Sequence, residues 1–347
     1  MSCLPSEPWK RYCTLAGPAG HDRRLNCKPG YSGCRTDCTS AQRQVAGTAQ
    51  RSPCKIGKPA LEPIGAQWAT AETMVYRLNS KQTLAAALAA TAQAEVADAI
   101  SALNTLPEHE AVHEVRKHCK KMRALLRLIR ADHKALYRRE NAHYRTLANQ
   151  LSANRDLVSI HDAFAAIAKP ADFPRTHAFI TGRSGQLGDR AALGQVGELL
   201  LQGAGRILFW PLAQLRWEHS QRGFLNTYRH ACSLKTVAIS RKSAEALHQY
   251  RKRTKDHWYH CRLLQERYPP LADRCTPLEA LAQALGDWRD LYLLCTLLKA
   301  EEEALSGELI PLLETASQRR AALFHQIKRL SADLFPRGKF ALFGAHT

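Results

Sequence analysis

Long apolar runs, alternating strand patterns and aromatic residues are all scarce in this sequence of 347 residues. No apolar run approaches the roughly 18 residues of a membrane-spanning helix, so we expect no membrane span. No segment of useful length alternates apolar and polar residues as a half-buried strand does. Aromatic residues make up only 7%, and good helix formers such as Leu, Ala, Arg and Glu are common. The composition therefore predicts an all-α protein.

Acidic residues are also scarce relative to basic ones. The chain has 31 Asp and Glu residues against 50 Lys and Arg residues, a formal net charge of +19. Such a surplus attracts polyanions, which include nucleic acid, anionic membrane surfaces and phosphate polymers. The alternative is a basic protein with no specific partner. Apolar residues, at 45%, are enough for a real core. The first residues lack the basic-then-apolar layout of a secretory signal, so we expect a cytoplasmic protein.

The cysteines form neither a convincing metal site nor a disulfide framework. Disulfides are disfavoured because no secretory signal is seen. Cys34 and Cys38 have the short spacing of a zinc pair, but a zinc site usually needs two such pairs. We expect no metal site and no cofactor. Six of the eleven cysteines lie before residue 60, and the other five are expected to be small buried apolar residues: Cys119, Cys232, Cys261, Cys275 and Cys295.

The chain divides into an irregular start and a helical remainder. Residues 1–65 are rich in Cys, Pro, Gly, Ser and Arg without periodicity, and we expect them to be disordered or poorly ordered. Residues 66–347 are expected to form one helical domain, with a first repeat at about 66–168, a connection at about 169–205 and a second repeat at about 206–347. The expected helices span about 68–103, 109–131, 137–151, 155–167, 191–202, 208–237, 241–268, 276–287, 288–305 and 311–334.

Two segments are copies of each other, and each places a histidine and several cations on one helical stripe. The first begins at His113 and the second at His248. Positions i, i+3, i+4 and i+7 share one face of a helix. Two further matching segments, 148–157 and 282–291, repeat at nearly the same offset, so an internal duplication is the simplest explanation. The stripes consist of His113, Arg116, Lys117, Lys120, Arg123 and Arg127 in the first copy, and of His248, Arg251, Lys252, Lys255 and Arg262 in the second.

The duplication of these stripes favours a binding role. Like charges at this spacing repel each other and cost stability. A single cationic stripe is more often a solvated helix face, and a single helical histidine is more often structural. A chain that builds the stripe twice is instead expected to lay it along a polyanion. We expect Asp156 and Asp290 to orient basic neighbours, and Trp258, Tyr259 and Trp288 to pack in the core.

The paired motifs resemble the CHAD family, an all-helical domain named for its conserved histidines. His113-x2-Arg-Lys-x2-Lys-x2-Arg-Ala-Leu-Leu-Arg is similar to the first repeat of that family, and His248-x2-Arg-Lys-Arg-x-Lys-Asp-His-Trp-Tyr is similar to the second. The resemblance covers roughly residues 68–345 and leaves the N-terminal segment 1–65 outside. One departure is Arg289-Asp290, where the family usually has His-Asp. A permanent charge there replaces a titratable one.

The resemblance implies two pseudo-symmetric antiparallel helical bundles whose basic helices line a shared central channel. It also implies non-enzymatic binding of inorganic polyphosphate, often on polyphosphate granules. The Glu-x-Glu-x-Lys signature of the triphosphate-tunnel enzymes that are fused to some members is absent. The expected polyphosphate-binding residues are His113, Arg116, Lys117, Lys120, Arg123, Arg127, Arg145, Arg155, His248, Arg251, Lys252, Lys255, Arg262, Arg289 and Lys339.

Two other functions stay open at this point. A nucleic-acid-binding protein would fit the charge, but no helix-turn-helix, zinc finger or aromatic stacking sheet is visible in the sequence. A metal-dependent polyphosphate or triphosphate hydrolase would need carboxylates that hold divalent cations. The basic repeats carry no such cluster, so no catalytic residue is assigned.

Overall fold

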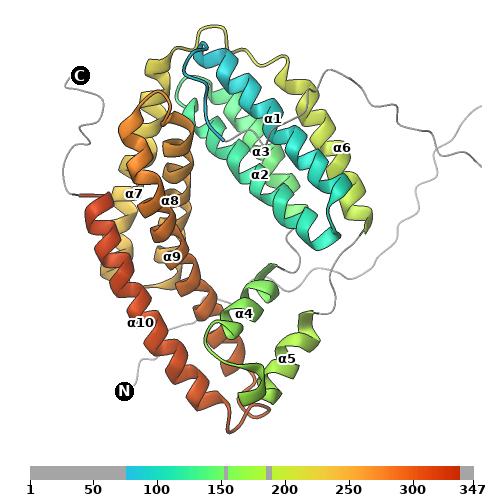
Figure 1. Ribbon diagram of the computed structural model, residues 1–347, viewed down its shortest axis with the longest axis vertical. Helices are drawn as coiled ribbons and strands as arrows, with labels where there is room; N and C mark the ends of the chain where they lie inside the picture. Colours follow the sequence, from blue (N-terminus) through green and yellow to red (C-terminus); the bar gives the residue numbers. More distant parts are fainter. Residues whose placement is uncertain (1–75, 152–154, 185–189, 337–347) are drawn as a thin grey trace, which may run out of the picture. The chain divides into compact units, whose positions relative to one another are not determined.

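The computed structural model describes residues 76–151, 155–184 and 190–336, and all of their regular structure is helical (Figure 1). The expectation of an all-α fold is confirmed for this part of the chain. The side chains of residues 155, 156, 184 and 190–192 are not described. Residues 1–65 and Lys339 lie outside the described ranges. None of the helices in those ranges combines the length and apolar character that crossing a membrane requires.

Most of the helices expected from the sequence are present, some of them with different boundaries. They are α1 (Leu84–Thr105), α2 (Glu108–Leu128), α3 (Lys134–Gln150), α4 (Arg155–Ala165), α5 (Pro174–Ser184), α6 (Arg190–Ile207), α7 (Trp217–Arg241), α8 (Ala244–Leu264), α9 (Ala272–Lys299) and α10 (Leu309–Leu334). Short 3-10 turns at Pro170–Asp172 and Pro269–Leu271 precede α5 and α9.

The first helix begins later than the alanine-rich pattern predicts. We expected a helix from about 68, but residues 76–83 are not helical and α1 starts at Leu84. The reason is a side-chain cap, because the Thr83 hydroxyl accepts a hydrogen bond from the Ala86 amide at 3.3 Å. The preceding segment runs along α8 instead, where the Leu78 amide donates to the Leu263 carbonyl at 2.9 Å.

One long helix replaces two that we expected in the second repeat. The range 276–287 and residues 288–299 belong to a single helix, α9, while residues 300–305, which we also expected to be helical, form turns. The matching region of the first half is broken, since α3 ends at Gln150 and α4 starts at Arg155. Pro277 lies near the start of α9, where a missing amide hydrogen removes only one bond of the helix. Neither that proline nor Gly286 interrupts the helix.

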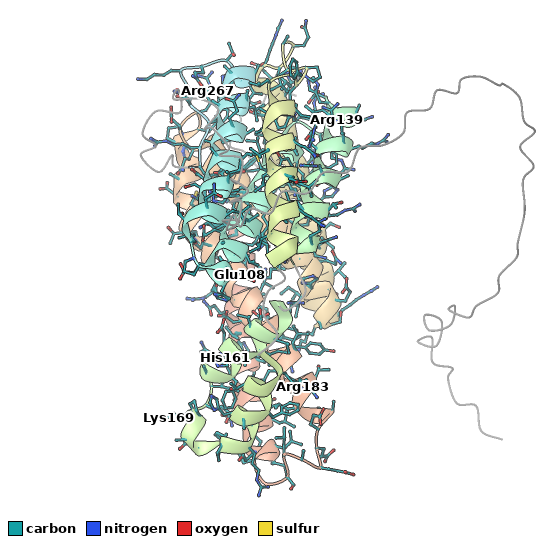
Figure 2. All side chains as sticks on the ribbon, turned by 90° about the vertical axis from the view of Figure 1, so that its right-hand side faces the viewer. Glu108, Arg139, His161, Lys169, Arg183 and Arg267 are labelled. Atoms are coloured by element: carbon teal, nitrogen blue, oxygen red, sulfur yellow. The ribbon has the colours of Figure 1, made fainter. Side chains whose placement is uncertain are left out.

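Four helices of the first half pack together. α1 lies against α2 and α6, and α3 lies against α2 and α6 (Figure 1). Helix α6 falls within the segment expected to connect the repeats, and it completes this group. An ion pair holds it, in which the fully buried Glu140 carboxylate of α3 lies 3.0 Å from the partly exposed Arg206 guanidinium of α6. Arg139, which is labelled in Figure 2, also contacts Glu140 at 2.8 Å.

The second half packs in chain order, with α7 on α8, α8 on α9 and α9 on α10. Helix α4 lies against α9 and α5 rather than against the first group (Figure 1). The boundaries that we expected for the two repeats stay a prediction, as does their superposition. Of the later cysteines, Cys119, Cys261 and Cys295 are buried as expected, while Cys232 and Cys275 are half-buried.

The two groups meet where α2 crosses α7 and α8. A Cβ atom on Gly223 of α7 would lie 1.8 Å from the Leu128 carbonyl oxygen of α2, so only glycine permits this approach. Beside it, the ring of His260 is fully buried, and burial lowers its pKa to about 4. The neutral ring donates through Nε2 to the Ala124 carbonyl at 2.9 Å. Its Nδ1 lies 2.9 Å from the Thr227 hydroxyl.

We predict that Gly223→Ala destabilises the protein strongly. The added methyl group must push α7 away from the α2 backbone, and we expect a loss of about 3 kcal/mol in the free energy of unfolding. Gly194→Ala is the matched control, because a Cβ atom there meets no atom within 4 Å. That change should be neutral or stabilising by up to about 1 kcal/mol. Urea denaturation of both variants is the measurement, and equal effects would mean that the crossing tolerates a wider spacing.

Candidate polyanion-binding site

Helix α2 carries the first stripe on the side opposite its apolar face. Val115, Cys119 and Met122 are buried on the apolar side, with at most 1% of their surface exposed. On the other side His113 is exposed, and Lys117 keeps 44% of its side-chain surface in solvent. Glu108, at the start of the helix, is labelled in Figure 2. The amphipathic pattern predicted from the sequence is therefore confirmed.

Neighbours on α2 pair with the Lys117 charge and shift the pKa of His113. The Lys117 ammonium forms an ion pair with the Glu114 carboxylate one turn before it. Burial and the nearby Lys120 ammonium lower the pKa of His113, and Lys117 and His109 lower it further. The Glu114 carboxylate opposes this shift. Without an anion nearby, the His113 ring is therefore neutral at pH 7.

Arg116 is tied to the end of α3. Its Nη1 atom donates to the carbonyl oxygens of Ala148 and Leu151, both at 2.7 Å. These carbonyls belong to the last turn of α3, where no helical partner exists for them. Arg251, at the equivalent step of α8, lies against the second motif of its own half. A Cβ atom on Gly286 would be 2.7 Å from its Nη2 atom. In both halves, therefore, the stripe arginine lies against the matched segment of its own half, 148–157 for Arg116 and 282–291 for Arg251.

Arg123 and Arg127 connect the stripe to other helices. The Arg123 Nε atom donates to the Asn141 side chain of α3 at 3.1 Å. Burial, then the Arg127 and Arg145 guanidinium groups, lower the pKa of Arg123 against the opposing effect of Asp256. Arg127 donates from Nη1 to Asp256 of α8 at 2.8 Å, and both side chains are nearly buried. Arg127 therefore has a structural role that the sequence alone did not show, and it joins α2 to α8.

Asp256 lies between cations from both halves. Arg253 of α8 binds its second carboxylate oxygen at 2.7 Å, while Arg127 binds the first. Burial nevertheless raises the pKa of Asp256, with the two guanidinium groups opposing the shift. The first stripe thus ends against the helix that carries the second stripe.

The second stripe, on α8, begins with a histidine surrounded by cations. His248 is half-buried, and burial together with Lys252 of α8 and Arg289 of α9 lowers its pKa to about 4. Arg251 acts in the same direction, and Glu245 opposes it. Lys252 is exposed. The structure therefore places Arg289 beside the second stripe, where it also lies 3.5 Å from Asp290.

The far end of the second stripe rests on aromatic rings. The Lys255 ammonium lies 5.1 Å and the Arg262 guanidinium 5.0 Å from the centre of the Trp258 ring. Trp258, Tyr259 and Trp288 are buried, with at most 8% of their surface exposed, so their expected packing role is confirmed. Cation–π contacts of this kind stabilise a cation through the negative face of the ring.

The remaining expected site residues are placed less fully. Arg145 is exposed on α3, within electrostatic reach of Arg123. Arg155 starts α4, but its side chain is not described, and Lys339 lies outside the described residues. The structure brings the two stripe helices together at the Arg127 end. A channel between the stripes stays a prediction.

The sequence reasoning missed two residues of α3. Asn141 binds Arg123, and Arg138 is exposed one helical step before it. Arg138, Asn141 and Arg145 follow an i, i+3, i+7 pattern, which puts them on one face of the helix. That spacing was visible in the sequence, but unlike the stripes it is not repeated in the second half, where Cys275 and Glu279 stand at the positions that match Asn141 and Arg145.

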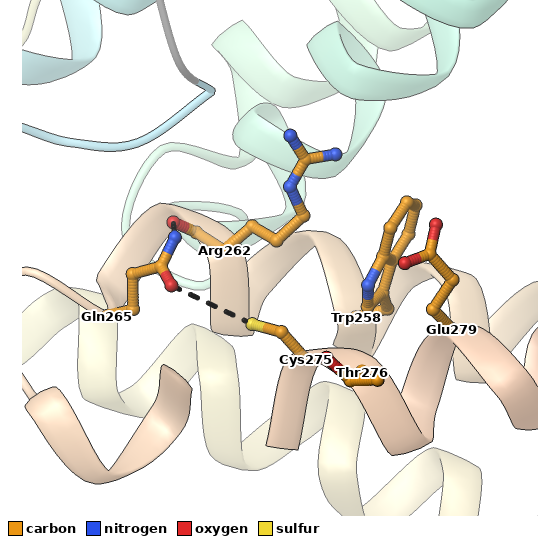
Figure 3. Close-up of a pocket in the computed structure, with 6 residues that line it drawn as sticks. All are labelled: Trp258, Arg262, Gln265, Cys275, Thr276 and Glu279. Carbon is orange, nitrogen blue, oxygen red and sulfur yellow. Dashed lines mark hydrogen bonds between the residues drawn. The ribbon is translucent and has the colours of Figure 1, made fainter. Parts of the chain in front are cut away.

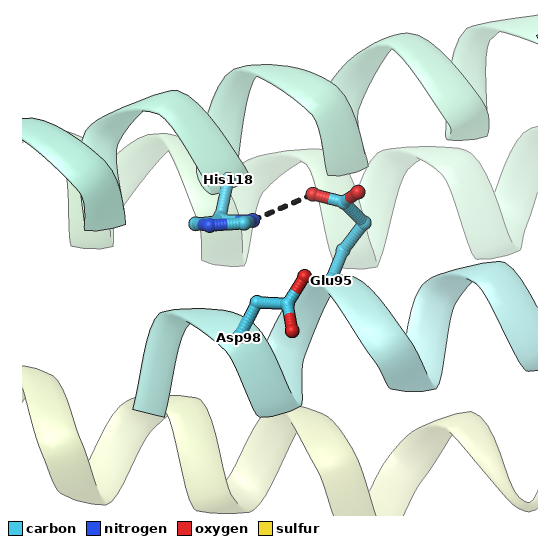
Figure 4. Close-up of side chains that lie close together, drawn as sticks. All are labelled: Glu95, Asp98 and His118. Carbon is cyan, nitrogen blue, oxygen red and sulfur yellow. Dashed lines mark hydrogen bonds and ion pairs between the residues drawn. The ribbon is translucent and has the colours of Figure 1, made fainter. Parts of the chain in front are cut away.

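A cluster between α1 and α2 has the composition of a metal site. Ligand atoms of Glu95, Asp98 and His118 lie within 4.8 Å of one another (Figure 4). The His118 Nδ1 atom is 2.6 Å from the Glu95 carboxylate, and the Lys121 ammonium is 2.9 Å from its other oxygen. Since a lysine ammonium already occupies one of the carboxylate oxygens, we interpret the cluster as a buried ion network.

Comparison with known proteins identifies the family. The CHAD-domain family model matches residues 82–299, which is more than half of the chain. The protein therefore belongs to the CHAD-domain family. A crystal structure of the CHAD domain from the plant Ricinus communis is similar, with a TM-score of 0.47 and 16% sequence identity over 78% of this chain and 98% of that chain. No curated protein matches the sequence.

We predict that Glu95→Gln lowers the free energy of unfolding by about 3 kcal/mol, because it leaves the nearly buried Lys121 charge without its carboxylate. Asp98→Asn, at the half-buried member of the cluster, should cost less. A chelator such as EDTA should leave the melting temperature of the wild type unchanged. A chelator-induced loss of stability that Zn²⁺ reverses in the wild type but not in His118→Gln would instead show a metal centre.

Proposed function

We propose that this protein binds inorganic polyphosphate through the stripes on α2 and α8, without catalysing a reaction. One observation carries the proposal: the two helices that bear the duplicated cations pack against each other, with Arg127 of one bound to Asp256 of the other at 2.8 Å. Membership of the CHAD-domain family supports it. In this proposal the protein works in the cytoplasm, on polyphosphate granules.

The side chains suit this ligand chemically. Polyphosphate carries about one charge per phosphate and presents only acceptor oxygens, which match the multi-donor fork of arginine and the mobile charge of lysine. Each stripe from the histidine to the second lysine spans about 10 Å, so one stripe holds only a few phosphates. Binding displaces counterions, and the affinity should therefore fall steeply as salt rises.

The two rival functions make different demands. Nucleic acid would use the same charge, but sequence reading needs side chains that reach base edges, and no such element is recognised in the described part of the chain. A hydrolase would need carboxylates that hold divalent cations beside the phosphate. In the cluster of Glu95, Asp98 and His118, the Glu95 carboxylate already pairs with Lys121 and His118. The nucleic-acid alternative is tested by letting DNA compete with long polyphosphate at equal phosphate concentration. The hydrolase alternative is tested by measuring phosphate release in the presence of Mg²⁺ or Mn²⁺.

We predict that long polyphosphate outcompetes DNA in the competition experiment above. We also predict that the two stripes form one site. Lys117→Glu and Lys252→Glu should each weaken polyphosphate binding, and the double variant should be non-additive by about 1 kcal/mol, because groups that share a ligand couple while distant ones do not. The measurement is the affinity for a short polyphosphate at fixed salt. Strict additivity, with each single variant keeping half the stoichiometry, would mean two separate sites. Failure of the wild type to bind at all would defeat the proposed function.

We predict that binding takes up a proton at His248. In the free protein its pKa is about 4, so the ring is neutral at pH 7. A bound phosphate chain adds negative charge beside the ring and raises this pKa, so affinity should increase as pH falls from about 7.5 towards 5.5. Calorimetry in two buffers of different ionisation enthalpy measures the uptake. His248→Gln should reduce it, and an unchanged uptake in that variant would assign the proton to another group, with His113 the next to be tested.

A further inference from the structure

The two halves differ at the far ends of their stripes. At the offset that relates His113 to His248, Arg123 of α2 corresponds to Trp258 of α8. At the offset that relates segment 148–157 to segment 282–291, Asn141 and Arg145 of α3 correspond to Cys275 and Glu279 of α9. Two cations and an amide in the first half are therefore replaced by an indole, a thiol and a carboxylate in the second.

The structure brings each of these sets together within its own half. In the first half, Arg123 binds Asn141 at 3.1 Å. Arg138 and Arg145 are exposed on the same face of α3 as Asn141. Arg127 and Arg145 both lower the pKa of Arg123, which burial lowers first. These guanidinium groups repel one another, and a bound anion would relieve that repulsion.

In the second half, the corresponding residues line a cavity of about 370 Å³ (Figure 3). Glu279 is exposed, and it lines the cavity together with Trp258 and Arg262. Burial raises the pKa of the Cys275 thiol, with Arg262 opposing the shift and Glu279 adding to it. The charges of Arg262 and Glu279 are therefore both felt at the Cys275 thiol inside this cavity. The cavity is lined by Trp258, Arg262, Gln265, Cys275, Thr276 and Glu279.

A phosphate chain bound along the stripes is not expected to extend into this cavity. The charges of Lys255 and Arg262 are directed at the Trp258 ring, at 5.1 and 5.0 Å. Glu279 presents a like charge to any phosphate that approaches them. By contrast, the α3 face has Arg145 at the position that matches Glu279, and Arg138 lies two turns before it.

We propose that the polyanion site is one-sided: bound polyphosphate continues from the stripes over α3, past Asn141 and Arg145, and Glu279 closes the opposite end at α9. This inference rests on the proposed function, and it names the residues that decide the direction of the bound chain. Glu279 is then a specificity-determining residue that limits how many phosphates the second half can hold.

The test compares variants that change the net charge by the same amount. Glu279→Gln removes the acid at the cavity, and Glu314→Gln removes an exposed acid on α10, which packs on α9 (Figure 1). Arg145→Gln removes the cation on α3, and Arg329→Gln removes an exposed cation on α10. The measurements are the affinity and the number of phosphates bound per protein for long polyphosphate at fixed salt, with the melting temperature as a check of folding.

We predict that Glu279→Gln tightens binding by about fivefold and that Arg145→Gln weakens it by about fivefold, as expected for one charge near the ligand in a solvent-exposed setting. Each α10 control should change affinity by less than about twofold, since α10 carries neither stripe and none of the residues that line the cavity, and exposed charges are screened by salt. Glu279→Lys should tighten binding further and raise the number of phosphates bound.

Equal effects of Glu279→Gln and Glu314→Gln would overturn the one-sided site, because net charge alone would then explain both. The same holds if Arg145→Gln and Arg329→Gln weaken binding equally. If the wild type binds polyphosphate and Lys117→Glu reduces this binding, either result leaves the proposed function intact. If the wild type does not bind polyphosphate, the proposed function fails first and this inference fails with it.

Discussion

The close crossing of α2 with α7 and α8 is the constraint on which the rest of the structure depends. Helix α2 already contacts α1 and α3, and it must also approach the second half without burying its cations unpaired. The chain meets this demand with Gly223, whose missing side chain lets α7 contact the Leu128 carbonyl. The neutral His260 ring and the Arg127–Asp256 ion pair supply the polar contacts at the same place. The two stripe helices are therefore joined at the end where they cross.

Concentrating cations along two neighbouring helices costs electrostatic energy, and the structure reduces that cost in several ways. Arg116 binds the carbonyl end of α3, Lys117 pairs with Glu114, and the last cations of α8 rest on Trp258. Arginine and lysine side chains carry several donors each, so one contact does not exhaust them. Lys117 still keeps 44% of its side-chain surface in solvent beside its glutamate. A cation that is paired for stability can therefore still face solvent, as the proposed anion binding requires.

The sequence predicted the all-helical fold and the two faces of α2, and it missed the parts that depend on tertiary contacts. The apolar and basic sides of α2 followed directly from residue spacing, and the packing of Trp258 was also expected. The start of α1 depends on the Thr83 cap and on a hydrogen bond between residue 78 and α8, which no periodicity reveals. Helix α6 looked like a connection because it is rich in glycine, and only its packing on α1 and α3 shows otherwise. Arg127 and its partner Asp256 are far apart in the sequence, beyond the reach of any local pattern.

The departure at Arg289 has a consequence for the histidine beside it. Where the family pattern has a histidine that can lose its charge, this chain keeps a permanent cation next to His248. Together with burial and Lys252, that cation holds the pKa of His248 at about 4, well below its usual value. A neutral neighbour would leave His248 easier to protonate, so the substitution suppresses its charge in the free protein. Under the proposed function, His248 would then gain its proton when the anion binds, so protonation would be a result of binding rather than a condition for it.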